Sequence, residues 1–143
     1  MTYLDASVIV KRYYAEAGTE RVHERWAVAA RLFTSRVAYA EVHAALARKR
    51  RERDLSASRY QQSVATFETE WPAYDHVAVD ATTLSDVQRL VSTYPLRGYD
   101  AVHLSAALWV QRQIGAALEF WVSDDRLETA ARAERFAVVN PVS

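Results

Sequence analysis

The sequence predicts an α/β fold in which helices cover both faces of a short parallel β-sheet. Short apolar or β-branched runs alternate along the chain with longer helical patterns, and this alternation is typical of parallel strands joined by crossover helices. Half of the 143 residues are apolar, which is enough for one compact core. The chain has no low-complexity linker and no internal repeat. We therefore expect a single domain over residues 1–143.

Five segments have the composition of buried strands. They are Thr2–Leu4, Leu32–Thr34, His76–Val79, Phe120–Val122 and Ala137–Val139. Each is a short run rich in apolar or β-branched residues. Right-handed crossovers place the carboxyl ends of parallel strands on one edge of a sheet, where open α/β proteins usually build their sites. That edge is the predicted place of the functional site.

Seven helical patterns occupy the intervals around these strands. In chain order they span Ser7–Glu16, Thr19–Ala30, Ser35–Arg51, Ser56–Trp71, Asp80–Val91, Asp100–Gln113 and Asp124–Arg135. The fourth begins with a serine suited to N-capping and ends just before Pro72, because proline cannot continue a helix. Gly115 is a suitable stop for the sixth.

The first three patterns each place apolar residues on one side of a helix. In the first these are Val8, Ile9 and Tyr13, and in the second they are Val22, Trp26, Ala29 and Ala30. In the third they are Val37, Ala40, Ala44 and Ala47. We expect these sides to face the core.

Four acidic residues occupy positions at which this topology directs a carboxylate into a site and not into solvent. Asp5 and Asp124 each follow an apolar strand and open a helix, and Asp100 opens an apolar helical stretch. Glu41 lies inside the third helical pattern among residues that belong to the core. A cluster of carboxylates is costly to bury without a cation, and its oxygens suit Mg²⁺ or Mn²⁺. If the fold brings the four together, the expected chemistry is metal-assisted phosphodiester hydrolysis.

Each of these residues also has an ordinary structural explanation. Asp5 or Asp124, taken alone, fits a helix N-cap that accepts backbone N–H groups. Glu41 alone fits a partner for a nearby arginine, and His103 fits a buried histidine whose hydrogen bonds are satisfied. The basic run Arg48–Arg53 fits a solvated helix end. Only the joint pattern favours a site, because the ordinary explanations do not require the acids to share an edge.

Composition excludes several other classes of protein. The absence of cysteine excludes a disulfide framework and a Cys-ligated zinc site. Three glycines are too few for a dinucleotide-binding loop or a P-loop, there is no Gly-x-Ser-x-Gly elbow, and the four histidines lack zinc spacing. A formal net charge of zero argues against a protein that coats nucleic acid by bulk electrostatics.

The chain also lacks the segments that would direct it to a membrane. No apolar run approaches the roughly 18 residues that a membrane span needs, and the N-terminus lacks a signal pattern. We therefore expect a cytoplasmic protein without a membrane partner. All but two of its 18 basic residues are arginine, the side chain better shaped for bidentate phosphate contact. We expect such contacts from Arg97 or from the run Arg48–Arg53.

Four segments, in order, carry a resemblance to a known family. They are Tyr3–Val10 around Asp5-Ala-Ser7, Ser35–Arg48 around Glu41, Leu96–Ala107 around Asp100-Ala-Val-His-Leu, and Ser123–Ala131 around Asp124. Together they resemble the successive motifs of PIN-domain ribonucleases, in particular the VapC toxins of bacterial toxin–antitoxin pairs. The resemblance covers essentially the whole chain at family-like spacing. The first motif alone is weak, whereas the third together with the other three is specific.

The resemblance implies a PIN-like three-layer α/β/α sandwich and a metal-dependent endoribonuclease that hydrolyses RNA phosphodiester bonds. It implies Mg²⁺ or Mn²⁺ held by the acidic quartet Asp5, Glu41, Asp100 and Asp124, which are also the catalytic residues. We expect Asp5 and Asp100 to be direct ligands. Ser7, two residues after Asp5, can orient a ligand or a water. The resemblance further implies a cognate VapB-type antitoxin and, commonly, a homodimer.

The fourth motif departs slightly from the family pattern, in which Thr/Ser-x-Asp is followed three residues later by leucine and then by a small pair. Asp124 has the spacing to Leu127 and to Ala130–Ala131, whereas Asp125 has the spacing from Ser123. We expect Asp124 to be the ligand and Asp125 to be auxiliary.

Two other functions stay open on this evidence. One is a PIN-fold nuclease that processes RNA or DNA outside a toxin–antitoxin system, and the other is a catalytically idle PIN fold that acts as a binding module. For the toxin, we expect the antitoxin to insert an arginine among the four acids. We also expect it to cover an apolar surface around Trp26, Val8 and Ile9.

Overall fold

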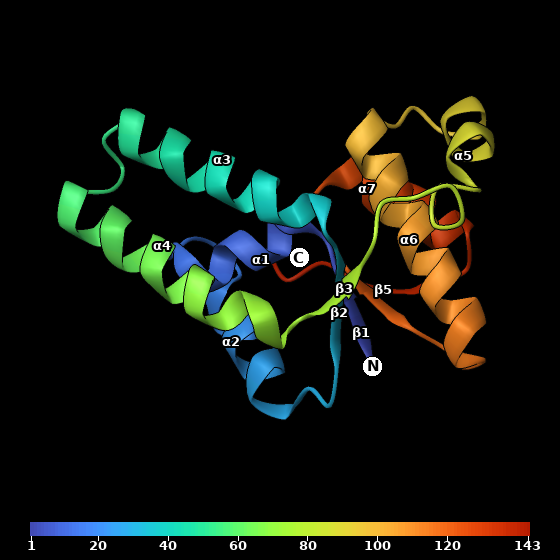
Figure 1. Ribbon diagram of the computed structural model, residues 1–143, viewed down its shortest axis with the longest axis horizontal. Helices are drawn as coiled ribbons and strands as arrows, with labels where there is room; N and C mark the ends of the chain where they lie inside the picture. Colours follow the sequence, from blue (N-terminus) through green and yellow to red (C-terminus); the bar gives the residue numbers. More distant parts are fainter.

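A five-stranded parallel sheet forms the centre of the computed structural model, which describes residues 1–143 (Figure 1). Its strands are β1 (Thr2–Leu4), β2 (Leu32–Ser35), β3 (Asp75–Val77), β4 (Glu119–Trp121) and β5 (Ala137–Val139). The order across the sheet is β3-β2-β1-β4-β5, and every neighbouring pair is parallel. All five predicted strands are present, with ends that differ by at most two residues.

The helices form one layer on each face of the sheet (Figure 1). They are α1 (Ala6–Tyr13), α2 (Thr19–Val28), α3 (Val37–Arg51), α4 (Ala57–Glu70), α5 (Val87–Thr93), α6 (Gly98–Ile114) and α7 (Asp125–Ala133), and a 3₁₀ turn, Trp71–Ala73, follows α4. Helices α1–α4 cover one face, and α5–α7 cover the other. The predicted three-layer α/β/α sandwich is confirmed.

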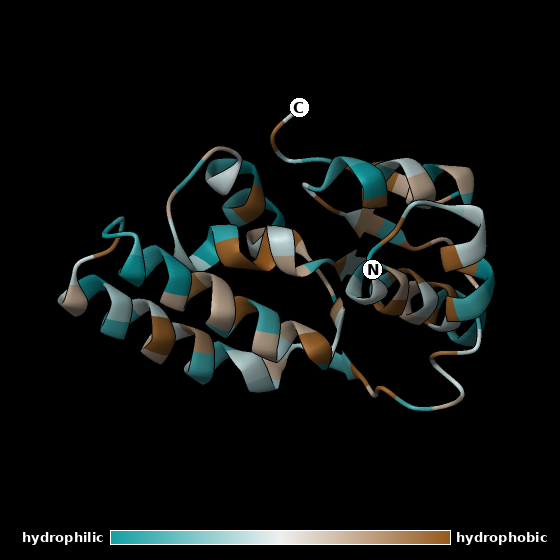
Figure 2. Cartoon of the chain, turned by 90° about the horizontal axis from the view of Figure 1, so that it is seen from above, coloured by the Kyte–Doolittle hydropathy of each residue, from teal (hydrophilic) through white to brown (hydrophobic).

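Two hydrophobic cores lie on the two faces because successive strand residues point to opposite sides. Tyr3 and Phe120 belong to the core under α5–α7, whereas their neighbours Leu4 and Trp121 belong to the core under α1–α4. All four are buried. Strands that are apolar on both sides are characteristic of a parallel sheet covered by helices. In Figure 2 the helices carry hydrophobic and hydrophilic residues side by side, as helices with one buried face do.

The predicted helix over Asp80–Val91 is wrong in its first half, since α5 begins only at Val87. Residues 81–86 form turns instead. The Asp80 carboxylate accepts from the backbone N–H of Thr82 and Thr83 at 3.0 Å each. Ser105 on α6 donates to the Thr83 carbonyl at 2.7 Å. These side chain–backbone bonds offer the segment an alternative to helical bonds.

The buried face of α3 also differs from the prediction. Ala38, Val42 and Leu46 are fully buried, whereas Ala40 and Ala44 are exposed. Burying valine and leucine removes more apolar area from water than burying alanine, so the helix turns its larger side chains inward. They pack in the core that α3 shares with α1 and α4. An open strip of small residues is left on α3.

The apolar surface expected around Val8 and Ile9 is absent because both side chains are fully buried. Helix α1 packs against α2, α3 and α4, so Val8 and Ile9 are not available to a partner. Near Trp26 the structure has instead a pocket of ≈ 320 Å³, lined in part by Leu32 and Tyr74. No helix of the protein has the length and apolar character needed to cross a lipid bilayer.

Candidate active site

Asp5 is held by the turn that joins β1 to α1. Its Oδ2 accepts from the backbone N–H of Ser7 at 3.1 Å and from the Ser7 hydroxyl at 2.5 Å. Asp5 is therefore an N-cap, as its ordinary explanation requires. The other oxygen, Oδ1, is turned inward and lies 3.6 Å from Nε2 of His103. The residue is only 5% exposed. One carboxylate thus caps a helix and also faces the inside of the site.

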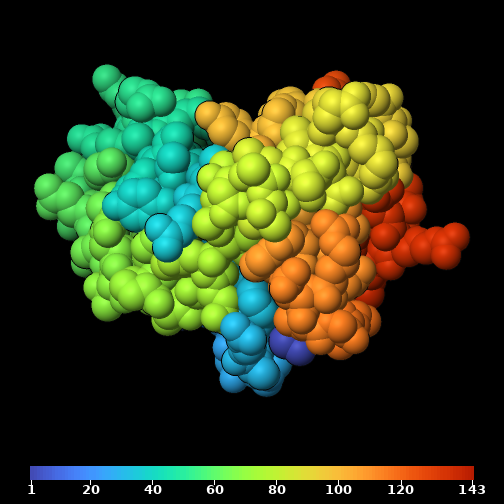
Figure 3. Space-filling view, turned by 45° about the vertical axis from the view of Figure 1, so that its right-hand side comes forward, coloured from blue at the N-terminus to red at the C-terminus, as the bar shows by residue number.

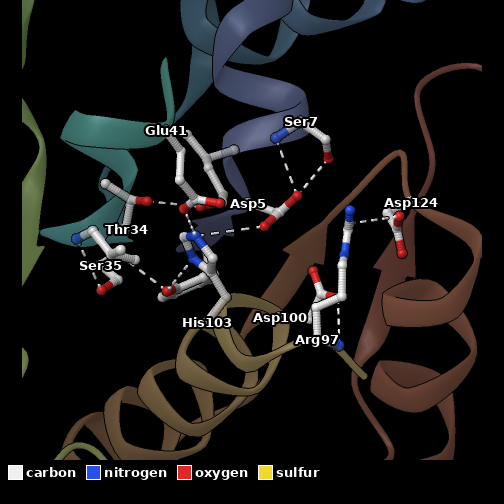
Figure 4. Close-up of polar contacts among 12 residues, drawn as sticks. Asp5, Ser7, Thr34, Ser35, Glu41, Arg97, Asp100, His103 and Asp124 are labelled. Carbon is white, nitrogen blue, oxygen red and sulfur yellow. Dashed lines mark hydrogen bonds and ion pairs between the residues drawn. The ribbon is translucent and has the colours of Figure 1, made fainter. Parts of the chain in front are cut away.

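Glu41 and Asp5 meet at His103, a fully buried residue of α6 (Figure 4). Nε2 of His103 lies 2.5 Å from Oε1 of Glu41, and Nδ1 lies 2.9 Å from the hydroxyl of Tyr3. The backbone N–H of Ser35 donates to that hydroxyl at 3.1 Å. In the neutral imidazole, Tyr3 therefore donates to Nδ1 and Nε2–H donates to Glu41. A chain of hydrogen bonds from β2 fixes the direction of the Glu41 carboxylate.

The charges around His103 favour its protonation. Burial lowers the pKa of His103, but the carboxylates of Asp5 and Glu41 outweigh it, so that the pKa lies above its usual value. Asp100 acts in the same direction. Burial, followed by the charge of Asp5, raises the pKa of the Tyr3 hydroxyl. Three acids therefore act electrostatically on one buried imidazole.

Asp100 and Asp124 meet at a different base, Arg97. Oδ2 of Asp100 accepts from the backbone N–H of Arg97 at 3.0 Å and from its Nε at 3.1 Å. Nη2 of Arg97 donates to Oδ2 of Asp124 at 3.2 Å. The Asp124 Oδ1 accepts from the backbone N–H of Leu127 at 2.9 Å, so this residue caps α7. These contacts raise the pKa of Arg97, the hydrogen bond to Asp100 most of all.

The acidic quartet is therefore gathered as two pairs at the carboxyl edge of the sheet (Figure 4). His103 lies between Asp5 and Glu41, and Arg97 lies between Asp100 and Asp124. The pairs are close enough to act on each other, since Asp5 also raises the pKa of Arg97. As the side chains stand, no three histidine or acidic groups surround a common point that could hold a metal ion.

The donor atoms nevertheless fit a hard cation. The backbone N–H of Ser123 donates to the Ser7 hydroxyl at 3.0 Å, which ties the end of β4 to Asp5. The hydroxyl of Ser123 is the one buried side-chain oxygen or nitrogen of the protein without a hydrogen-bond partner. Carboxylate and hydroxyl oxygens are the groups that Mg²⁺ and Mn²⁺ prefer. An unsatisfied buried oxygen beside Asp124 in the chain, tied through Ser7 to Asp5, is what a site completed by a water or an ion would leave.

The two candidates of the fourth motif are placed differently. Asp124 accepts a hydrogen bond from Arg97, whereas Asp125 is exposed and its side chain makes no hydrogen bond or ion pair. This geometry favours Asp124, and the choice stays a prediction.

Several residues of the site escaped the sequence reasoning. The sequence indicates Tyr3 only as part of a strand, and Ser123 only through its spacing to Asp125. His103 was interpreted as a satisfied core histidine, which is correct, but its contact with Glu41 was not foreseen. A signal was present in its spacing from Asp100, because residues three apart share one face of a helix.

Comparison with known proteins gives a consistent result. A model of the PIN domain family matches residues 2–133. Ribonuclease VapC45 of Mycobacterium tuberculosis (strain CDC 1551 / Oshkosh) is 37% identical over 133 residues, covering 93% of this chain and 90% of the relative. Among solved structures, FitAcB from Neisseria gonorrhoeae matches with a TM-score of 0.73 at 18% identity, over 99% of this chain and 98% of that one. A toxin–antitoxin complex from Klebsiella pneumoniae matches with a TM-score of 0.67 at 18% identity and the same coverage.

Proposed function

Since the chain belongs to the PIN-domain family and, within it, to the VapC toxins, we propose that it is a metal-dependent endoribonuclease. In this proposal it hydrolyses RNA phosphodiester bonds as the toxin of a type II toxin–antitoxin pair. The observation that carries the proposal is the acidic quartet at the carboxyl edge of the sheet, where Asp5 meets Glu41 and Asp100 meets Asp124. A catalytically idle fold would have no need to keep all four.

Mg²⁺ or Mn²⁺ would be held by Asp5 and Asp100 directly, with Glu41 and Asp124 completing the ring. When bound, the ion supplies Lewis-acid polarisation of the phosphoryl oxygen and a more acidic water. The chain's own residues position these oxygens. Ser7 holds Oδ2 of Asp5 and leaves Oδ1 facing inward.

His103 and Arg97 have different tasks in this mechanism. His103 is buried and fixes the rotamer of Glu41 through its Nε2. Arg97 is 69% exposed and lies on Asp100 and Asp124. Its guanidinium neutralises part of their charge, and it can turn outward to contact a phosphate of the substrate.

The direct experiment is incubation of purified protein with total RNA and Mg²⁺, followed by mapping of the cleaved ends. Discrete new ends that disappear with EDTA are expected. Asp5→Asn is the matched control, because the amide keeps the shape of the carboxylate and loses its charge. RNA that stays intact with wild-type protein and Mg²⁺ would reject the proposal. Equal cleavage by Asp5→Asn would mean that the activity does not come from this site.

The proposed partner is a VapB-type antitoxin that inserts an arginine among the four acids. The contacts of Arg97 support this, because its guanidinium lies between Asp100 and Asp124. We further propose a single-domain protein that forms a homodimer and acts in the cytoplasm. In a complex, replacing the inserted arginine by alanine should weaken both binding and inhibition. A complex whose acidic site is open and untouched would exclude this mode of inhibition.

A further inference from the structure

A groove leads away from the acidic site along α1 and α3. It has a volume of ≈ 590 Å³, and its near end is lined by Ser7 and Glu41. Ala44 lines its middle, and Arg48 and Arg51 line its far end. We call it the α1–α3 groove. In the space-filling view, α3 lies beside the start of α6 at the upper edge of the molecule, and α1 is hidden behind this face (Figure 3).

The lining of the groove follows from the periodicity of α3. Glu41, Ala44, Arg48 and Arg51 are spaced by three or four residues, which places them on one face of the helix. At a rise of about 1.5 Å per residue, Arg48 lies roughly 10 Å and Arg51 roughly 15 Å along the helix from Glu41. The alanines between them leave the floor of the groove open. One helix face therefore carries an acid, small residues and two bases in that order.

The positive charge at the far end of the groove is uncompensated. Neither Arg48 nor Arg51 takes part in any ion pair or side-chain hydrogen bond of the protein. The other cation in the lining, Lys11, is bound to Glu16 at 2.9 Å and is buried. A neutral protein with two unpaired arginines at one end of a groove presents a local anion-binding surface there.

The structure divides the basic run at the end of α3. Arg48 and Arg51 line the groove, whereas Lys49 lies over the ring of Tyr14, at 4.8 Å from its centroid. Arg50 and Arg53 are exposed and do not line the groove. Only two of these basic side chains are therefore in a position to act together with the acidic site.

We propose that the α1–α3 groove binds the backbone of single-stranded RNA next to the scissile phosphate, with Arg48 and Arg51 each contacting a phosphate. This inference rests on the proposed function, since it assigns the substrate path of the same site. Guanidinium groups bind phosphate oxygens bidentately. The two arginines lie along one helix face of a groove of ≈ 590 Å³, and a groove that tracks the backbone is how proteins bind single strands. The near end delivers that run to Glu41 and Asp5.

The test is the affinity of a fluorescent single-stranded RNA oligonucleotide, measured by anisotropy over a series of salt concentrations. Ca²⁺ replaces Mg²⁺ to occupy oxygen ligands, and a gel checks that the RNA stays intact. The variant Arg48→Gln/Arg51→Gln should bind at least about tenfold more weakly, and its salt slope should fall by about 1.4, as for two lost single-strand phosphate contacts. The matched control Arg50→Gln/Arg53→Gln removes the same charge outside the groove and should stay within about twofold.

Equal losses in the two variants, or no loss in the groove variant, would overturn the proposal. Weaker binding of a protein partner with unchanged RNA affinity would also overturn it and would assign the groove to that partner. Cleavage separates this inference from the proposed function. When cleavage is assayed with Mg²⁺, the groove variant should have a higher KM for RNA than the wild type and nearly the same kcat. If the wild-type protein cleaves RNA and the groove variant binds RNA with normal affinity, the groove proposal is wrong and the proposed function stands.

Discussion

At the scale of single residues, the site is organised by two nitrogen bases that separate four carboxylates. His103 and Arg97 each lie between two acids, and neither pair of acids is adjacent in the sequence. Two carboxylates this close repel each other, and an N–H donor between them offsets part of that repulsion. The two bases differ in exposure, since His103 is fully buried and the side chain of Arg97 is 69% exposed. The side chain of Arg97 is therefore the one that can move away from its two acids.

The exposure of Arg97 leads to a prediction about cation binding. Its guanidinium occupies carboxylate oxygens of Asp100 and Asp124 that a divalent ion would need. Arg97→Ala should therefore bind Mn²⁺ several-fold more tightly in a calorimetric titration, in keeping with about 1 kcal/mol for an exposed ion pair. Arg97→Lys is the control, because it keeps a charge but loses the fork that bridges two acids. Unchanged or weaker binding by Arg97→Ala would mean that the arginine does not compete with the ion.

A second prediction separates the two acids of the fourth motif. Asp124→Asn keeps an oxygen that can cap α7 but loses the charge, so cleavage should fall on the order of 10² or more with little loss of stability. Asp125→Asn should lose far less, because its side chain is exposed and makes no hydrogen bond or ion pair. Initial rates at equal protein concentration decide between them. The reverse ranking would assign the ligand to Asp125.

At the scale of helices and strands, a polar tie joins α5 to the end of α7. Glu134 accepts from Nη2 of Arg89 at 2.6 Å and from the hydroxyl of Tyr94 at 2.7 Å. The hydrogen bond from Arg89, and that from Tyr94, hold the pKa of Glu134 below its usual value. Only 13% of the Glu134 side chain is exposed. The tie therefore contributes to stability only while this carboxylate is charged.

The sign of the pH dependence follows from that lowered pKa. The contribution is complete above the ordinary pKa of a glutamate and is lost as the pH falls through the lower folded value. Glu134→Gln should therefore have a lower free energy of unfolding than the wild type at neutral pH. The difference should be at most about 1 kcal/mol, because Arg89 is half exposed. The difference should vanish in acid. A difference that persists at low pH would mean that packing, and not charge, explains the effect of the substitution.

The order and type of the elements could be predicted from sequence, but some faces and boundaries could not. Strand and helix patterns follow local periodicity, and for that reason the five strands were found. The first half of the predicted Asp80–Val91 helix failed because Ser105, far along the chain, bonds to Thr83. The face of α3 was wrong because its alanines obey the same period as Val42 and Leu46. Only packing against α1 and α4 decides which set is buried.

At the scale of the whole molecule, the fold brings together at one edge what the sequence keeps far apart. Two cores hold the sheet from both faces, and the carboxyl ends of β1 and β4 carry Asp5 and Asp124 to the same side. The identity of the four acids could be predicted because strand ends and helix starts are local features. The bonds of His103 to Glu41 and of Arg97 to Asp124 could not, since they depend on side-chain positions from distant segments.

The central claim is that the acidic quartet is the site of a metal-dependent ribonuclease. It is tested most directly by Asp100→Asn, assayed for RNA cleavage with Mg²⁺ and for thermal stability in metal-free buffer. The account predicts a folded protein that no longer cleaves, because the amide keeps the shape of the carboxylate and cannot hold the ion. It also predicts that the variant stays folded in metal-free buffer, because an amide oxygen at this position can still accept from the backbone N–H of Arg97. Undiminished cleavage by the pure, folded variant would contradict the claim.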